Sequence, residues 1–283
     1  MKPSVTKNKS SNKSALNLKA SKVLKDYSDF ARSVLSWYKT YGRHDLPWRR
    51  SITPYKILVS EIMLQQTQVS RVHDKYKMWM TKYPTLRALS LATLEEVLIL
   101  WQGLGYQRRA KALLTIAKEH RCIPKTYEGL LTLPGIGEYT ASAIMAFAYD
   151  SFSPMLETNI RTALIETFHT KKKVVSDEAL KIDLAHLTSC KEVQSVGARI
   201  GYYALMDYGA YLKKEGISHN ARTKGYRKQT AYIGSQRKVR AEVLFAITHN
   251  VALPQDARVP EVLEVLAKER FIIGSTKSGW HIA

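Results

Sequence analysis

The stretch Leu133-Pro134-Gly135-Ile136-Gly137-Glu138-Tyr139-Thr140 decides the fold of this chain. It joins two short segments, 127–133 and 141–149, whose apolar residues recur at helical spacing. Two glycines in so tight a turn allow the main chain to come close to a partner. The N–H groups that open the following helix point outward, and the helix dipole favours an anion there. The stretch therefore predicts a hairpin between two helices that binds an anion through its backbone. An ordinary helix–turn–helix connection is the alternative.

Helical periodicity continues on both sides of this hairpin, from about residue 23 to residue 212. Pro54 is a good first residue for a helix. Further helices are expected over 27–38, 54–64, 86–101, 110–117, 159–168 and 196–212. No segment in this region shows a convincing strand pattern, so we predict an all-α core.

The composition favours a polyanionic partner. The 283 residues carry 44 Lys and Arg against 24 Asp and Glu, a net charge of +20, and 45% of them are hydrophobic. Such an excess of positive charge suits nucleic acid. An anionic membrane surface is the rival interpretation, but no basic amphipathic helix dominates. The two cysteines, Cys122 and Cys190, exclude a disulfide framework and a multi-cysteine metal cluster, and they indicate a reducing compartment.

The two ends of the chain differ in composition from the core. Residues 1–22 are rich in Lys, Ser and Asn, and we predict a disordered basic arm. Residues 213–235 are a predicted basic linker with interleaved tyrosines. Residues 236–283 show two helical stripes and then a hairpin signal at Ser278-Gly279. Helix, helix and hairpin predict a small winged-helix-like module, which either binds DNA or packs on the core.

Two carboxylates stand in segments that could carry chemistry. Glu61 lies among apolar residues in the stretch 59–69, and burial would raise its pKa and suit it to act as a general acid. Glu157 opens a helix after an apolar stretch. Taken alone, Glu61 is better interpreted as a residue of a helix surface, and Glu157 as a helix cap.

Several of these segments together resemble one family. They are Leu46-Pro47-Trp48-Arg49, Pro54-Tyr55-Lys56, Ser60-Glu61 to Val69, Gly103-Leu104-Gly105-Tyr106, Leu133 to Thr140, and Ala204-Leu205-Met206-Asp207-Tyr208-Gly209. The chain resembles the helix–hairpin–helix DNA glycosylase superfamily, and within it the MutY-type adenine glycosylases, over roughly residues 30–212. The resemblance implies a two-lobed helical core over residues 23–212.

The resemblance also implies a role for each matching residue. Glu61 would protonate the departing adenine, and Glu157 would stabilise the positively charged sugar. Asn159 and Tyr139 would orient that carboxylate and the sugar intermediate. The base would be flipped out of the duplex, because its glycosidic bond cannot be reached inside the stack. Two carboxylates in two protonation states, Glu61 neutral and Glu157 ionised, meet the needs of this cleavage.

The remaining candidate residues would contact DNA or the base. Gln65 and Tyr106 would wedge into the DNA stack, and Trp48 would form a wall of the adenine pocket. The full set of predicted DNA contacts is Gln65, Gln66, Tyr106, Gly135, Gly137, Thr140 and Arg109, and that of the base pocket is Trp48 and Arg49. The carbonyl groups of the hairpin could also hold a monovalent cation.

Four features set the chain apart within this family. The sugar-stabilising carboxylate is normally Asp, and the extra methylene of Glu157 moves the charge by about 1.5 Å. Residues 210–240 lack the four cysteines that hold an iron–sulfur cluster in most members, so we expect no cluster. The segment 236–283 is too short for the domain that reads 8-oxoguanine in full-length adenine enzymes. Tyr139 stands where lyase members carry Lys and cannot form a Schiff base, so we expect hydrolysis without strand cleavage.

The sequence therefore predicts a base-excision DNA glycosylase that removes adenine paired with 8-oxoguanine or guanine. The alternatives are a thymine or uracil mismatch glycosylase and a non-catalytic protein that binds damaged DNA. The expected partner is double-stranded DNA with a mismatched or oxidised base pair. We expect a monomer that makes no use of a membrane and that acts in the cytoplasm at the nucleoid.

Overall fold

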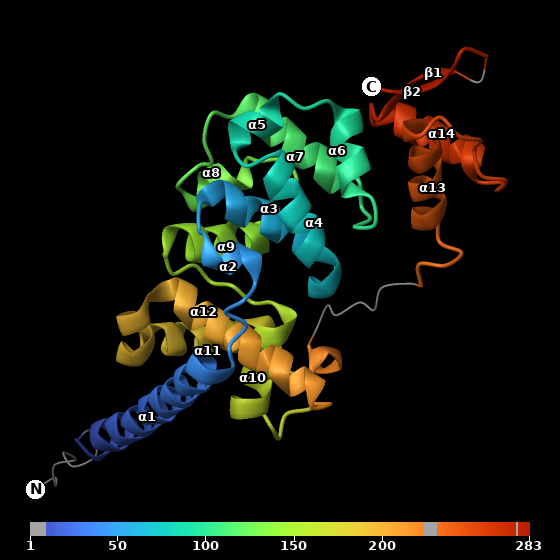
Figure 1. Cartoon of the computed structure of the whole chain (residues 1–283). Helices are drawn as coiled ribbons and strands as arrows, with labels where there is room; N and C mark the ends of the chain where they lie inside the picture. The colour runs from blue at the N-terminus through green and yellow to red at the C-terminus, as the bar shows by residue number, and fades with distance from the viewer. Residues whose placement is uncertain (1–9, 224–230, 276) are drawn as a thin grey trace, which may run out of the picture. The chain divides into compact units, whose positions relative to one another are not determined.

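The structure of the chain is a computed structural model that describes residues 10–223, 231–275 and 277–283 (Figure 1). Its residues divide into two compact units. The first unit comprises Met1–Arg43 and Asp150–Tyr226, and the second comprises His44–Tyr149 and Arg227–Ala283. None of the helices that the structure describes is long and apolar enough to cross a lipid bilayer.

The first unit is a group of helices packed around α12. Its elements are α1 (Ser10–Tyr41), α10 (Thr158–Phe168), α11 (Asp177–Ser189), α12 (Lys191–Lys214) and the short 3-10 helix η1 (Asn220–Arg222). Helix α12 packs against α1, α10 and α11, and it kinks at Gly197, which has φ 83°. A side chain at Gly197 would meet the Asp150 carboxylate at 2.6 Å, so the kink requires glycine.

The second unit is built around α3, which is buried along most of its length. Its helices in the central part of the chain are α2 (Pro47–Arg50), α3 (Pro54–Leu64), α4 (Val69–Lys82), α5 (Leu86–Ser90), α6 (Leu94–Trp101), α7 (Arg108–Glu119), α8 (Tyr127–Leu131) and α9 (Glu138–Tyr149). Helix α3 begins at Pro54 behind the cap Thr53 and packs against α4, α7 and α9 (Figure 1). Apolar residues lie on all sides of α3, and a helix of this kind is expected to be buried on every face.

The C-terminal part of the second unit holds the predicted small module. It consists of α13 (Gln236–Thr248), α14 (Val259–Lys268) and an antiparallel hairpin of β1 (Ile272–Ser275) and β2 (Gly279–Ile282), with Ser275 opposite Gly279. The predicted order of helix, helix and hairpin is confirmed. The module shares a unit with residues 44–149, because α13 contacts α6 and because an ion pair joins Arg108 on α7 to Glu269, which follows α14. This contact agrees with the alternative in which the module packs on the core.

The described chain is mostly helical with one small sheet, as the sequence predicts. Three details differ from the prediction. The segment 86–101 is two helices, because Thr93 and Glu96 form a capping box that starts α6 anew. Helices α4 and α11 were not among those expected. Residues 10–22 lie in α1 where a disordered arm was expected, since a helix nucleated by its packed part extends at small cost per residue. Residues 1–9 lie outside the described part of the chain.

Candidate active site

Glu61 is a buried carboxylate in the middle of α3, and 5% of its surface is exposed. The hydroxyl of Tyr139, in the first turn of α9, donates to Glu61 Oε2 at 3.5 Å. This contact arises because α3 and α9 pack against each other. The structure therefore brings together Glu61 and Tyr139, two predicted catalytic residues that are 78 positions apart. The surface-exposed alternative for Glu61 is wrong.

The hairpin between α8 and α9 has the geometry that its glycines predict. Gly135 has φ 78°, in the left-handed region that favours glycine. A Cβ at Gly137 would meet no atom within 4 Å, so the backbone there can be approached closely. Gln65 ties this turn to the end of α3, since its side-chain amide donates to Gly135 O at 3.3 Å and to Thr140 Oγ1 at 3.1 Å. The turn and the loop after α3 thus form one connected surface.

Arg109 lies inside the second unit and joins two loops. It is 8% exposed, and burial lowers its pKa to about 10, so the guanidinium is charged at neutral pH. It donates hydrogen bonds to the carbonyl groups of Ile62, Met63, Gln65, Leu104 and Gly105 and to the hydroxyl of Thr67. Arg109 was predicted to contact DNA. Instead, the structure directs its donors to the protein backbone, because the residue falls on the buried stripe of α7.

The two loops that Arg109 joins each carry a strained residue. Gln66 has φ 55° and Tyr106 has φ 48°, and each directly follows a carbonyl group that accepts from Arg109. A left-handed conformation of a non-glycine residue costs of order 1 kcal/mol or more and persists where surrounding contacts fix it. Both side chains are exposed. The exposed side chains of Gln66 and Tyr106 thus each follow backbone that Arg109 holds.

The other residues predicted to contact DNA or base vary in exposure. Gln65 is half-buried, whereas Thr140 is 3% exposed and accepts from Gln65. The position of Thr140 does not support the predicted contact between its side chain and DNA, since its hydroxyl faces the interior. Trp48 is buried with its ring packed edge-on against Tyr76 at 5.4 Å, and Arg49 beside it is half-buried. Their predicted role in a base pocket stays a prediction.

The second predicted carboxylate, Glu157, caps α10 in the first unit. Its Oε1 accepts from the backbone N–H groups of Asn159 and Ile160, each at 2.8 Å. Its Oε2 accepts from Asn159 Nδ2 at 3.0 Å and from the Thr158 hydroxyl at 3.3 Å. The carboxylate is therefore fixed by four donors of its own helix. The helix-cap interpretation is confirmed, and the predicted pairing of Asn159 with Glu157 is present as well.

Two opposing effects act on the acidity of Glu157. Burial raises the pKa of its carboxyl above the ordinary value, while the backbone hydrogen bonds and the charge of Lys213 lower it. Lys213 is the last residue but one of α12 and was assigned from sequence to a linker. Burial lowers the pKa of Lys213 in turn, and the charge of Glu157 raises it. The sequence offered one signal for Lys213, namely Gly216, because a glycine commonly follows the last residues of a helix.

Gly209 sets the distance between α12 and the start of α10. A Cβ at this position would lie 2.0 Å from the carbonyl oxygen of Asn159, so no other residue fits without a backbone shift. Asp207, two residues earlier, is 2% exposed and accepts from the backbone N–H and the Nε of Arg43, each at 2.7 Å. The motif that ends at Gly209 is thus a packing motif that positions Glu157 and Asn159.

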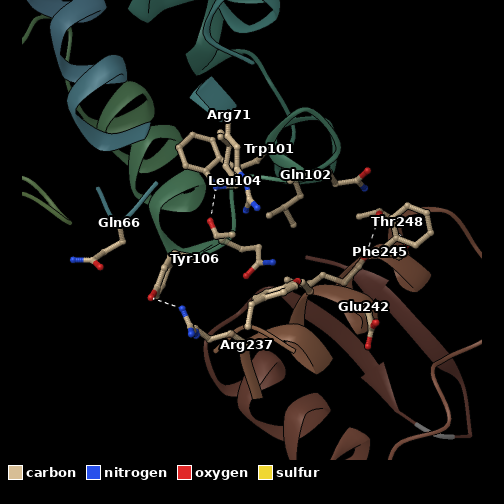
Figure 2. Close-up of a pocket in the computed structure, with 17 residues that line it drawn as sticks. Gln66, Arg71, Trp101, Gln102, Leu104, Tyr106, Arg237, Glu242, Phe245 and Thr248 are labelled. Carbon is tan, nitrogen blue, oxygen red and sulfur yellow. Dashed lines mark hydrogen bonds between the residues drawn. The ribbon is translucent and has the colours of Figure 1, made fainter. Parts of the chain in front are cut away.

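The second unit also holds a cavity of about 600 Å³ beside Tyr106 (Figure 2). Its walls are the loop 102–107, the end of α6 and one face of α13. Arg237 Nη1 donates to the Tyr106 hydroxyl at 2.8 Å, and the Arg237 guanidinium lies over the Tyr106 ring at 5.5 Å. Sequence reasoning did not anticipate this cavity, because its two sides are more than 130 residues apart.

Metal chemistry was not expected from the sequence. Among the described residues, no group of three or more His, Cys, Asp and Glu side chains could hold a metal ion. The stretch from residue 210 to residue 240 contains no cysteine.

The hairpin between two helices exposes its glycine backbone, and a helix-capping carboxylate follows it in the sequence. Both features agree with the resemblance to helix–hairpin–helix DNA glycosylases. The model of the HhH-GPD superfamily of base excision DNA repair proteins matches residues 59–204, which is more than half of the chain. The chain belongs to this superfamily.

The chain is similar to several proteins described as adenine DNA glycosylases. It is 46% identical over 142 residues to the one from Mycolicibacterium smegmatis, which covers 48% of each chain. It is 43% identical over 151 residues to the one from Rattus norvegicus, covering 48% of this chain and 29% of that protein. The matched region thus spans about half or less of the length of these relatives.

Solved structures with a similar fold include a thermostable thymine-DNA glycosylase. It has a TM-score of 0.55 and 25% identity and covers 70% of this chain and 95% of that chain. A trapped endonuclease III–DNA covalent intermediate has a TM-score of 0.52 at 16% identity over 64% of this chain and 83% of that one. These two likenesses agree with the helical fold described above.

Proposed function

We propose that this chain is a monofunctional DNA glycosylase that removes adenine mispaired with 8-oxoguanine or guanine from double-stranded DNA. The observation that carries the proposal is the buried carboxyl of Glu61, approached by the hydroxyl of Tyr139. The similarity to adenine DNA glycosylases, at 46% identity over 142 residues, supports adenine as the base.

The proposed reaction breaks the bond between the sugar C1′ and the base nitrogen. The electron pair of that bond leaves with the base, and the proton of the Glu61 carboxyl goes to a ring nitrogen of adenine. The sugar is left as an oxocarbenium ion, which the negative charge of Glu157 stabilises. Water then adds to C1′ and passes a proton to the Glu61 carboxylate that the first step left ionised, so the products are free adenine and an abasic site. Positioned proton transfer of this kind contributes about 10²–10⁴-fold to a rate.

Hydrolysis without strand cleavage follows from the residue at the hairpin. Tyr139 has no amine, so it cannot attack C1′ to form a Schiff base. The proposal needs no iron–sulfur cluster, since the net charge of +20 supplies many cations for phosphate contact. We include in the proposal that the enzyme acts as a monomer in the cytoplasm, at the nucleoid if its source is bacterial.

The hydrogen bonds of Glu157 bear on a second candidate function, which is binding of damaged DNA without catalysis. Its carboxylate is engaged by four donors of its own helix, which would suit a purely structural cap in a non-catalytic protein that binds damaged DNA. The similarity in fold to a thymine-DNA glycosylase supports thymine as an alternative base. The retention of Glu61 and Tyr139 in contact favours an enzyme, because a binding protein needs neither.

The substitution Glu61→Gln tests the general acid directly. It keeps the size of the side chain and removes the proton that it donates. We expect the single-turnover rate of adenine excision to fall at least 100-fold, with the Kd for mismatched duplex changed less than about threefold. Glu95→Gln, on the exposed face of α6, is the matched control and should keep the wild-type rate. Equal losses of rate and affinity in Glu61→Gln would contradict the assignment.

A further inference from the structure

The cavity beside Tyr106 has the size and the side chains of a binding site. Its volume of about 600 Å³ lies within the range of about 300–1,000 Å³ that is usual for small-molecule sites. Exposed aromatic rings line it on both sides, with Tyr106 on the core loop and Phe245 and Tyr232 on or before α13. Figure 2 shows Tyr106 and Arg237 meeting at one end of the cavity and Phe245 lying at the other.

The polar groups around the cavity suit a base joined to a phosphate. Arg71 and Arg237 are cations in its wall, and Glu242, an acidic residue there, is paired with Lys238 at 3.3 Å. Side-chain amides of glutamine, from Gln66 and Gln102, can both donate to and accept from the edge of a base. Aromatic rings interleaved with cations are the usual means of holding an unpaired nucleotide.

The α13 side of the cavity is fixed to the core by a charged cluster. Glu269, which follows α14, accepts from Arg108 on α7 and from Arg240 on α13. Lys111 donates to the carbonyl groups of Glu269 and Arg270, and it lies 4.8 Å from the ring centre of Phe271. Because this cluster involves both α7 and α13, the two walls of the cavity are held as one body.

We propose that α13 and the loop 102–107 together form a site for one unpaired nucleotide of the bound DNA, adjacent to the point where Tyr106 enters the stack. The base stacks on Phe245 or Tyr232, and Arg237 or Arg71 pairs with its phosphate. This inference rests on the proposed function only in that the ligand is DNA. The proposal gives the small C-terminal module a direct contact with DNA. The sequence alone did not decide whether this module binds DNA or only packs on the core.

Photochemical cross-linking with the full chain locates the nucleotide. In a duplex with an adenine mismatch, 5-iodo-2′-deoxyuridine replaces one nucleotide at a time on both strands within three positions of the target adenine. Irradiation joins this base to an aromatic side chain on which it stacks. We expect a cross-link to Phe245 or Tyr232 from one or two positions only, identified by mass spectrometry. Cross-links confined to residues 44–149, or spread evenly over all positions, would overturn the proposal.

Variants of the module measure what the site contributes. We expect Phe245→Leu to raise the Kd for mismatched duplex about tenfold, since one stacked base contributes on that scale. Arg237→Gln should lower the slope of log Kd against log salt by about 0.9, as expected for one lost phosphate contact. Lys268→Gln and Ile273→Ser, exposed residues of the same module outside the cavity, are the matched controls and should bind like the wild type. Thermal unfolding of each variant reports whether it is folded.

The outcomes separate this inference from the proposed function. Cross-links and affinities as expected, together with no excision of adenine, would uphold the site and refute the proposed activity. Excision of adenine at the wild-type rate and affinity by both Phe245→Leu and Arg237→Gln would refute the site and leave the activity standing.

Discussion

Replacing Arg109 with alanine removes a guanidinium that joins the loop after α3 to the loop before α7. Its six acceptors form two groups, one in residues 62–67 and one at residues 104–105. A hydrogen bond from a charged donor contributes about 1.5–3 kcal/mol, and buried acceptors left unpaired cost about 1–3 kcal/mol each. Several acceptors share one donor nitrogen and some can be rehydrated, so we expect a net destabilisation of about 3–5 kcal/mol.

This loss is a large part of the usual 5–15 kcal/mol of free energy of unfolding. For a chain of this size it corresponds to a fall in Tm of about 10 °C. Urea unfolding followed by circular dichroism measures the change. Below the new Tm, the rate of adenine excision should still be reduced, because Gln66 and Tyr106 lose the carbonyl contacts that fix their left-handed backbone. A change smaller than about 1 kcal/mol together with a wild-type excision rate would refute this reasoning.

Arg108→Ala is the matched control for Arg109→Ala. The two arginines are neighbours on α7, but the Arg108 side chain is 72% exposed and its ion pair with Glu269 lies at the surface. Exposed ion pairs contribute about 0–1 kcal/mol. Both variants remove one arginine charge, but only Arg109→Ala removes a buried one. The difference between their free energies of unfolding therefore measures the effect of burial.

Three further predictions concern the first unit and the module. Burial raises the pKa of Glu157 above 4.5, the ordinary value for glutamate, and the reaction needs its ionised form. The single-turnover excision rate should therefore begin to fall with decreasing pH while the pH is still above 4.5, which gives the pH profile an acid limb. Glu157→Gln should excise slowly and lack this acid limb. Gly209→Ala should lower the free energy of unfolding by about 2–4 kcal/mol and reduce excision, because its Cβ would lie 2.0 Å from Asn159 O. Glu269→Ala should leave the half-buried Arg240 without its carboxylate partner. The free energy of local unfolding of the module should fall by about 1–3 kcal/mol, so limited proteolysis should cut the module faster.

Each of these has a control and a contradicting result. A pH profile of Glu157→Gln that keeps the acid limb of the wild type would assign that limb to another group. Gly216 has a positive φ of 83°, unlike Gly209, and a Cβ there would meet no atom within 4 Å, so Gly216→Ala should cost only about 1 kcal/mol. Equal effects at both glycines would contradict the packing argument. Glu264→Ala, exposed on α14, should leave the proteolysis rate unchanged.

The sequence predicted those parts of the fold that depend on local patterns. The turn around Gly135 and Gly137, the helix start at Pro54 and the cap at Glu157 are each encoded within a few residues. The order of elements in the C-terminal module followed from the same kind of signal. The packing of that module against residues 44–149 depends instead on contacts such as that between Glu269 and Arg108. These two residues are 161 positions apart, so no local pattern encodes their contact.

The side chains of the site were predicted less completely, for a physical reason. Charged residues are usually exposed, so Arg109 was assigned to DNA. Its place on the same stripe as Ala112, Leu113 and Ile116 was the signal for burial, and Arg108 lacks it. Lys213 was missed as a neighbour of Glu157 because the end of α12 was placed too early.

Single-turnover excision by the full chain tests the central claim most directly. The duplexes carry adenine opposite 8-oxoguanine, adenine opposite guanine, thymine opposite guanine, and uracil opposite guanine, and strand breaks are read with and without alkali. We predict breaks at adenine only, and only after alkali, as expected of an adenine glycosylase without lyase activity. Breaks at thymine or uracil, or breaks without alkali, would contradict the account. Tight binding without breaks on any duplex would contradict it as well and would favour a protein that only binds damaged DNA.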